Sequence, residues 1–92
     1  MADKTYRVYI LRCADGSLYT GITNDIEKRL RAHNNGTAAR YTRGRGPVEL
    51  VYTETVTDKP AALRRELQIK ALTREQKLQL IQHTDQIIDN KP

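Results

Sequence analysis

The sequence contains no phenylalanine, no tryptophan and only one cysteine, Cys13, among its 92 residues. A single cysteine excludes an internal disulfide and a multi-cysteine metal site. Cys13 adjoins a predicted turn, so a structural thiol is favoured over a nucleophile, and we expect a reducing, cytoplasmic setting. No apolar run approaches the roughly 18 residues of a membrane span, and the first residues lack the apolar stretch of a signal peptide.

The chain does contain tyrosine and positive charge. All five of its aromatic residues are tyrosines, at positions 6, 9, 19, 41 and 52. A core that needs only ring volume normally includes Phe, so an all-phenol set indicates that some hydroxyls are used. Sixteen Lys and Arg residues against eleven Asp and Glu give a net charge of +5. A small basic domain of this kind favours polyanionic partners, nucleic acid above all.

The residue pattern predicts one α+β domain over residues 1–92, with its core at about residues 6–82. Runs rich in β-branched and alternating apolar residues predict three strands, at residues 6–12, 18–23 and 48–55. Capping signals predict three helices, at residues 24–36, at 58–72 and from 73 onward. The order ββαβαα is typical of a three-stranded antiparallel sheet flanked by helices.

Individual residues set the expected boundaries. Asp15-Gly16 is a hairpin turn signal between the first two strands. Asn24 is expected to cap the first helix, with Glu27 as its capping-box partner. On the second helix, the spacing of the apolar side chains predicts an inward stripe that includes Leu63 and Leu67. Thr73 and Gln76 form a capping box for the third helix, whose apolar side chains are expected at Leu78, Ile81 and Ile88.

Tyr9 and Tyr19 lie on the two strands of the predicted hairpin. If the paired residue numbers sum to an even total, both phenols share one face of the sheet. Gly21 would then leave room on that face for the close approach of a substrate. The alternative is that both tyrosines only fill the sheet.

Arg29 and His33 are four residues apart, so both project from the same side of the first helix. Such a pair can hold a phosphate ester, but it also occurs on ordinary solvated helix faces. His33 has a second alternative, as a solvated residue near a helix C-terminus, where the dipole favours its cation.

The segment before the third strand carries three arginines, a tyrosine and two glycines. We expect Arg40, Arg43 and Arg45 to contact backbone phosphates and Tyr41 to stack on bases, with Lys70 as a further basic contact. The neighbouring Thr42 is expected only to form a local turn. A flexible loop without ligands is the alternative.

The hairpin tyrosines and the helix pair together resemble the GIY-YIG nuclease domain. Val8-Tyr9 stands where the first motif of that family ends, with Arg7 in place of its opening glycine, and Tyr19-Thr20-Gly21 matches the second motif with Thr for Ile. Arg29 and His33 match the helix pair of the family. The resemblance covers nearly the whole chain and points most of all to small stand-alone, YhbQ-like bacterial members.

This resemblance implies metal-dependent hydrolysis of phosphodiester bonds in DNA, with RNA as a second class of partner. Glu66 matches the metal-binding glutamate of the family, for Mg²⁺ or Mn²⁺, although it could instead form a surface ion pair with Lys70. Tyr9 is the candidate to orient or deprotonate the attacking water, with help from His33, while Tyr19 holds the phosphate or water network and Arg29 stabilises the transition state. The alternative function is a non-catalytic nucleic-acid-binding module on the same fold.

Overall fold

The structure, a computed structural model, describes the backbone of residues 5–89 and the side chains of residues 5–83. Its elements follow the predicted order ββαβαα. They are β1 (Tyr6–Arg12), β2 (Leu18–Thr23), α1 (Ile26–Asn34), β3 (Glu49–Val56), α2 (Lys59–Lys70) and α3 (Arg74–Asp89). The predicted α+β class is therefore confirmed. Within the described residues, no helix is long and apolar enough to cross a membrane.

The sheet has the strand order β2-β1-β3, with both pairs antiparallel and β1 in the centre. Tyr9 lies opposite Gly21, and Leu11 lies opposite Tyr19. Each of these pairs of numbers sums to thirty, an even total, so Tyr9 and Tyr19 share one face, as predicted. A register irregularity follows Ile10 in the pairing of β1 with β3.

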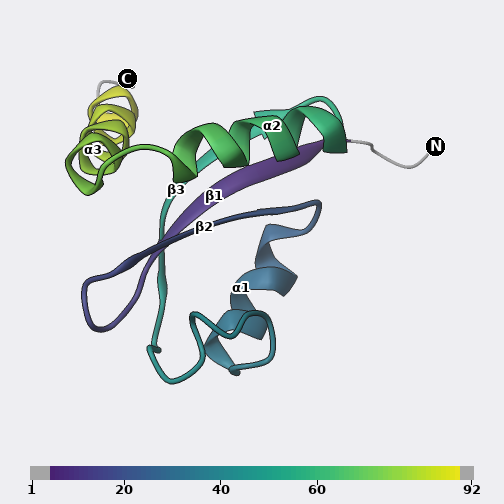
Figure 1. Ribbon diagram of the computed structural model, residues 1–92, viewed down its shortest axis with the longest axis vertical. Coiled ribbons are helices and arrows are strands. Elements are labelled where there is room, and N and C mark those ends of the chain that lie inside the picture. The colour runs from purple at the N-terminus through teal and green to yellow at the C-terminus, as the bar shows by residue number, and fades with distance from the viewer. Residues whose placement is uncertain (1–4, 90–92) are drawn as a thin grey trace.

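Helices cover the two faces of the sheet unequally (Figure 1). Helix α1 lies against one face, where Tyr9, Leu11 and Cys13 are buried with the partly buried Ile26 and Leu30. Helices α2 and α3 lie on the other side, over an aliphatic cluster that includes Val8, Ile10, Ala62, Ile69 and Ile81. Cys13 is thus a core thiol, as the structural interpretation expects. The two faces of β1 belong to two different cores.

The observed N-caps match the predicted ones for α2 and α3 but not for α1. Asp58 accepts from the backbone N–H of Ala61, and Thr73 with Gln76 forms the expected capping box. The predicted cap Asn24 is wrong, because Asp25 accepts from the backbone N–H of Lys28 instead. The Thr23 hydroxyl, at the end of β2, accepts from the Asp25 backbone N–H, and this turn moves the helix start one residue along.

The predicted inward stripe of α2 is also wrong. Leu63 and Leu67 are 43% and 68% exposed, whereas Ala62 and Ile69 are fully buried. With Ala62 and Ile69 facing the sheet, the positions between them on the same side of the helix are those of Arg65 and Glu66. The apolar periodicity misleads here because α2 uses two of its inward positions for charged side chains. The predicted side chain of Ile88 on α3 lies outside the described side chains.

Candidate functional site

The centre of the candidate site is the phenol of Tyr9, which the middle strand of the sheet carries toward α1. Tyr9 and His33 are each only 2% exposed, and the phenolic oxygen lies 2.9 Å from Nε2 of His33. His33 is therefore not the solvated helix-end residue that one interpretation of the sequence allowed. A buried phenol and a buried imidazole satisfy each other across the space between β1 and α1.

The second nitrogen of His33 fixes the direction of this hydrogen bond. Nδ1 lies 2.8 Å from the hydroxyl oxygen of Thr42, and that hydroxyl donates to the carbonyl of Ala39 at 3.2 Å. We assign the Thr42 hydroxyl proton to the Ala39 carbonyl, so that the Thr42 oxygen accepts from Nδ1–H of His33. Nε2 then carries no proton and accepts from the Tyr9 hydroxyl. The site thus contains a neutral imidazole with its basic nitrogen against a phenol.

Thr42 is a residue that sequence reasoning assigned only to a local turn. It is 1% exposed and orients His33 from the segment between α1 and β3. Its position directly after Tyr41, in a segment of candidate contacts, was the only signal in the sequence. The hydrogen bond to His33 spans nine residues and follows from the tertiary fold.

Gly21 has a different role from the predicted one. A Cβ atom at this position would lie 2.6 Å from the hydroxyl oxygen of Tyr9 and 2.7 Å from Cζ of the same ring. These distances are too short for non-bonded atoms, so the missing side chain makes room for Tyr9 itself and not for a substrate. Gly21 of the second motif thereby leaves the space that Tyr9 of the first motif occupies.

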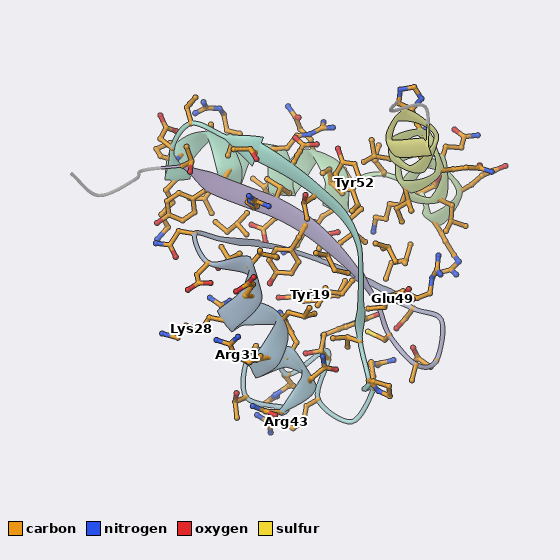
Figure 2. All side chains as sticks on the ribbon, turned by 180° about the vertical axis from the view of Figure 1, so that it is seen from behind. Tyr19, Lys28, Arg31, Arg43, Glu49 and Tyr52 are labelled. Carbon is orange, nitrogen blue, oxygen red and sulfur yellow. The ribbon has the colours of Figure 1, made fainter. Side chains whose placement is uncertain are left out.

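Tyr19 forms a half-buried layer next to this hydrogen-bonded pair. Its ring centroid lies 6.4 Å from that of Tyr9 and 5.2 Å from that of the His33 imidazole. On its other flank the Tyr41 ring lies 5.7 Å away. Figure 2 shows Tyr19 between the sheet and α1, on the opposite side of the sheet from Tyr52. The aromatic groups therefore form a continuous cluster from the buried phenol toward the loop.

Two opposite charges act on the Tyr9 oxygen. Burial raises the pKa of the Tyr9 phenol well above its ordinary value of 10, and the neighbouring Tyr19 adds to this rise. Arg29 lowers the same pKa and Glu66 raises it. The pKa of His33 is lowered, first by burial and then by Arg29. The fold therefore brings the candidate catalytic residues from β1, β2 and α1 together with the candidate metal ligand on α2.

Arg29 points into solvent from α1. It borders a shallow cleft of about 240 Å³ together with Lys28 and Ala32 of the same helix and Thr23, Asn24 and Asp25 before it. Among the described side chains, no carboxylate lies within ion-pair distance of this guanidinium. Its five N–H donors are available for an anionic ligand.

Glu66 is the candidate metal ligand, and its side chain is 16% exposed. It forms the ion pair with Lys70 that the alternative interpretation expected, at 3.1 Å. The described residues contain no group of three or more His, Cys, Asp or Glu side chains that could enclose a metal ion. One hard carboxylate whose charge acts on the Tyr9 phenol nevertheless fits Mg²⁺, which keeps several waters and takes further ligands from substrate phosphate.

The predicted nucleic-acid contacts divide into two groups. Arg40 and Arg43 are exposed. Arg45 and Lys70 already hold carboxylates, with Arg45 bound to Asp15 at 2.5 Å. Tyr41 is 41% exposed, and the guanidinium carbon of Arg45 lies 4.4 Å from its ring centre. Contacts of Arg45 with Asp15 and with the Tyr41 ring thus hold this segment in the structure.

Residues 5–79 match the family described as the GIY-YIG catalytic domain. A UPF0213 protein from Clostridium perfringens is 66% identical over 74 residues, which are 80% of each chain. A UPF0213 protein from Haloquadratum walsbyi is 53% identical over the full length of both chains. A solution NMR structure of an E. faecalis protein has a TM-score of 0.61 at 40% identity, covering 89% of this chain and 88% of that one. These relatives confirm the family that the sequence resembles.

Proposed function

The chain belongs to the GIY-YIG catalytic-domain family, a nuclease family, and from this premise we propose that it is a metal-dependent nuclease that hydrolyses phosphodiester bonds in DNA. The observation that carries the proposal is the buried hydrogen bond between the Tyr9 phenol and His33, with Arg29 and Glu66 near enough for their charges to act on that phenol. Hydrolysis requires a base that can take up a proton, and the basic nitrogen of His33 beside the Tyr9 phenol supplies one.

The proposed proton path begins at the attacking water and passes through Tyr9 to His33. The water reaches Tyr9 past the half-buried ring of Tyr19 and donates its hydrogen bond to the phenolic oxygen. As the water oxygen bonds to phosphorus, its proton moves to Tyr9 and the phenolic proton moves to Nε2 of His33. No free phenolate is formed, so the raised pKa of Tyr9 does not oppose the reaction.

The charged residues act on the phosphate. Arg29 donates to the non-bridging oxygens and stabilises the charge that they gain in the transition state. Glu66 would hold Mg²⁺ or Mn²⁺, which supplies Lewis-acid stabilisation of the phosphate and the leaving oxygen. Lys70 would leave Glu66 and turn toward the strand. The exposed Arg40 and Arg43 continue the positive surface along the backbone of the nucleic acid.

The alternative function is a nucleic-acid-binding module without cleavage. It is favoured by the ion pair between Glu66 and Lys70, which occupies the candidate metal ligand. In that case DNA or RNA would bind to the same basic surface without a chemical step. We place either activity in the cytoplasm, because the single cysteine of the chain is a buried free thiol.

Purified protein incubated with branched, duplex and single-stranded DNA and with RNA, in Mg²⁺, Mn²⁺ or chelator, tests this proposal. We expect metal-dependent cleavage of DNA that Glu66→Gln abolishes and the exposed Glu75→Gln leaves unchanged. Paramagnetic broadening by Mn²⁺ should reach α2 resonances in the wild type and disappear in Glu66→Gln. Binding without cleavage of any substrate would overturn the nuclease and support the binding module.

A further inference from the structure

The loop between α1 and β3 is tied to the β1–β2 turn at a single residue, Arg45. Its backbone carbonyl accepts from the backbone N–H of Ala14 at 2.7 Å, and its guanidinium holds Asp15. Within the loop, backbone N–H groups of Arg43 and Arg45 bond to carbonyls three residues earlier. The loop is therefore a set of tight turns anchored at one end on the hairpin.

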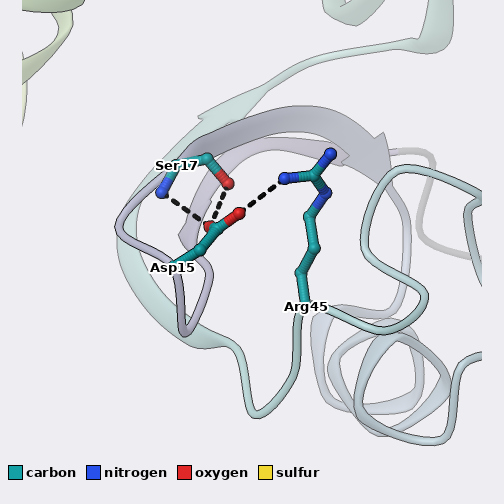
Figure 3. Close-up of polar contacts among 3 residues, drawn as sticks. All are labelled: Asp15, Ser17 and Arg45. Atoms are coloured by element: carbon teal, nitrogen blue, oxygen red, sulfur yellow. Dashed lines mark hydrogen bonds and ion pairs between the residues drawn. The ribbon is translucent and has the colours of Figure 1, made fainter.

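Asp15 divides its two oxygens between two tasks (Figure 3). Oδ1 accepts from both the backbone N–H of Ser17, at 3.0 Å, and its hydroxyl, at 2.6 Å. Oδ2 accepts from the guanidinium of Arg45. The pKa of Asp15 is lowered to about 2, mainly by the Ser17 hydroxyl and backbone and also by Arg45, so the carboxylate is ionised at neutral pH. One oxygen serves the turn and the other serves the loop.

The Arg45 guanidinium, which binds Asp15, also contacts the aromatic cluster. Its central carbon lies 4.4 Å from the centre of the Tyr41 ring, which is cation–π distance. Tyr41 in turn lies against Tyr19, with the ring planes 31° apart. The contacts thus run from Asp15 through Arg45 and Tyr41 to Tyr19, whose ring lies beside His33. Thr42, which orients His33, is the next residue after Tyr41.

We propose that Asp15 is a positioning residue of the site, and that its ion pair with Arg45 holds the Tyr41 ring against Tyr19 for contact with a nucleic acid strand. The proposal rests on the proposed function, because the strand is the substrate of the same site. With one nitrogen bound to Asp15 and its plane over Tyr41, Arg45 keeps further N–H donors for a phosphate. A ring fixed beforehand loses less conformational entropy when a strand contacts its exposed part, which is 41% of the Tyr41 surface.

Two substitutions separate this role from ordinary turn stability. Asp15→Asn keeps an oxygen for Ser17 but places an uncharged amide against the guanidinium. Ser17→Ala is the matched control, because it removes a hydrogen bond of the turn and leaves the carboxylate on Arg45. Arg45→Gln removes the other half of the ion pair. Exposed ion pairs stabilise little, so we expect Asp15→Asn to lower Tm by less than about 5 °C.

The test combines nuclear Overhauser contacts between the Tyr19 and Tyr41 rings with the affinity for a single-stranded DNA oligonucleotide in chelator. We expect Asp15→Asn and Arg45→Gln to weaken the ring contacts and to lower affinity about three- to tenfold, the range for one side chain that must be immobilised on binding. Ser17→Ala should change neither quantity. Cleavage is not measured, so failure of the proposed nuclease activity leaves this test intact.

Two results would overturn the proposal. One is an Asp15→Asn protein in which the ring contacts and the affinity both equal those of the wild type. The other is an equal loss of ring contacts and affinity in Ser17→Ala, which would assign the effect to the turn and not to the ion pair.

Discussion

The two faces of the sheet each bury a tyrosine whose hydroxyl bonds to a titratable side chain, and the two arrangements differ in what surrounds them. On the α2 side, Tyr52 donates to Glu54, whose other oxygen accepts from Arg65 at 2.8 Å. On the α1 side, Tyr9 donates to the neutral His33. Arg29, the cation that lowers the pKa of Tyr9, forms no ion pair with a carboxylate among the described residues. Figure 2 shows the two sides, marked by Tyr52 and Tyr19.

This difference distinguishes a structural network, around Tyr52, from the network around Tyr9 that we propose to be catalytic. Glu54 and Arg65 form an ion pair, so the Tyr52 network has no unpaired charge, and it links β3 to α2. In the Tyr9 network, Nε2 of His33 is a basic nitrogen that can take up the phenolic proton, and the Arg29 guanidinium, which no described carboxylate holds, can bind an anion. Burial raises the pKa of both phenols, that of Tyr52 to about 12 with help from Glu54. A raised tyrosine pKa therefore does not distinguish the candidate site from the Tyr52 network. The groups around the phenol, His33 and Arg29 at Tyr9 against Glu54 and Arg65 at Tyr52, do.

Substitution of one arginine on each side of the sheet should have opposite effects on activity and stability. Arg29→Ala should lower the cleavage rate by about 10²–10³, the usual loss for one donor to a transition-state oxyanion, with little change in stability. Arg65→Ala should do the reverse, because it leaves the half-buried Glu54 without its cation and costs about 1–3 kcal/mol of unfolding free energy. Cleavage kinetics and urea unfolding measure both quantities. Equal losses of activity in the two variants would contradict the contrast.

Gly21→Ala should disturb the packing of Tyr9 on the α1 side of the sheet and leave the Tyr52 network on the other side unchanged. The added methyl group would overlap the Tyr9 ring, so we expect a loss of about 1–3 kcal/mol in unfolding free energy together with loss of cleavage. If the overlap is the cause, the stability cost should shrink when the ring is removed by Tyr9→Ala. A double-mutant cycle measures this coupling. Additive effects would show that Gly21 is needed for another reason.

The pH dependence should come from His33. Its pKa in the folded state is lowered by burial and then by Arg29, so as pH falls below about 6.5 the unfolded chain binds the proton first. Stability is therefore full above that pH and declines as pH falls toward the folded-state pKa. Protonated Nε2 cannot accept from Tyr9, so kcat/KM should fall up to about tenfold per pH unit on the acid side. His33→Gln should remove this limb, and the exposed His83→Gln should keep it.

The smallest expected effect concerns Thr20, the middle residue of the second motif. It is 4% exposed, and its hydroxyl has no hydrogen-bond partner among the described residues. Thr20→Val should raise the unfolding free energy by about 1 kcal/mol and leave cleavage unchanged. Thr23→Val is the control of opposite sign, because the Thr23 hydroxyl bonds to Asp25 at the start of α1. Thermal unfolding of the two variants should shift in opposite directions.

Much of the fold could be predicted because its signals are local. Alternation places Tyr9 and Tyr19 on strands, and the caps at Asp58 and Thr73 are short-range hydrogen bonds. The inward side of α2 could not be predicted, because its apolar pattern points to Leu63 while the fold turns Glu66 inward. Which face of a helix packs on a sheet depends on tertiary contacts that no local period encodes.

The candidate site was predictable as a set of residues and not as a geometry. The family motifs supply Tyr9 and His33, but neither the hydrogen bond between them nor the orienting role of Thr42 follows from spacing. The fit of Gly21 under Tyr9 likewise requires the strand register. The pair of Asp15 and Arg45 spans thirty residues and is visible only in the folded chain.

The most direct test of the contrast compares Tyr9→Phe with Tyr52→Phe on one DNA substrate in Mg²⁺. Each change removes one buried hydroxyl and keeps the ring. We expect Tyr9→Phe to lower the single-turnover cleavage rate by about 10²–10⁴ with the fold intact, while Tyr52→Phe cleaves at the wild-type rate. Cleavage by Tyr9→Phe at a rate equal to that of Tyr52→Phe would contradict it.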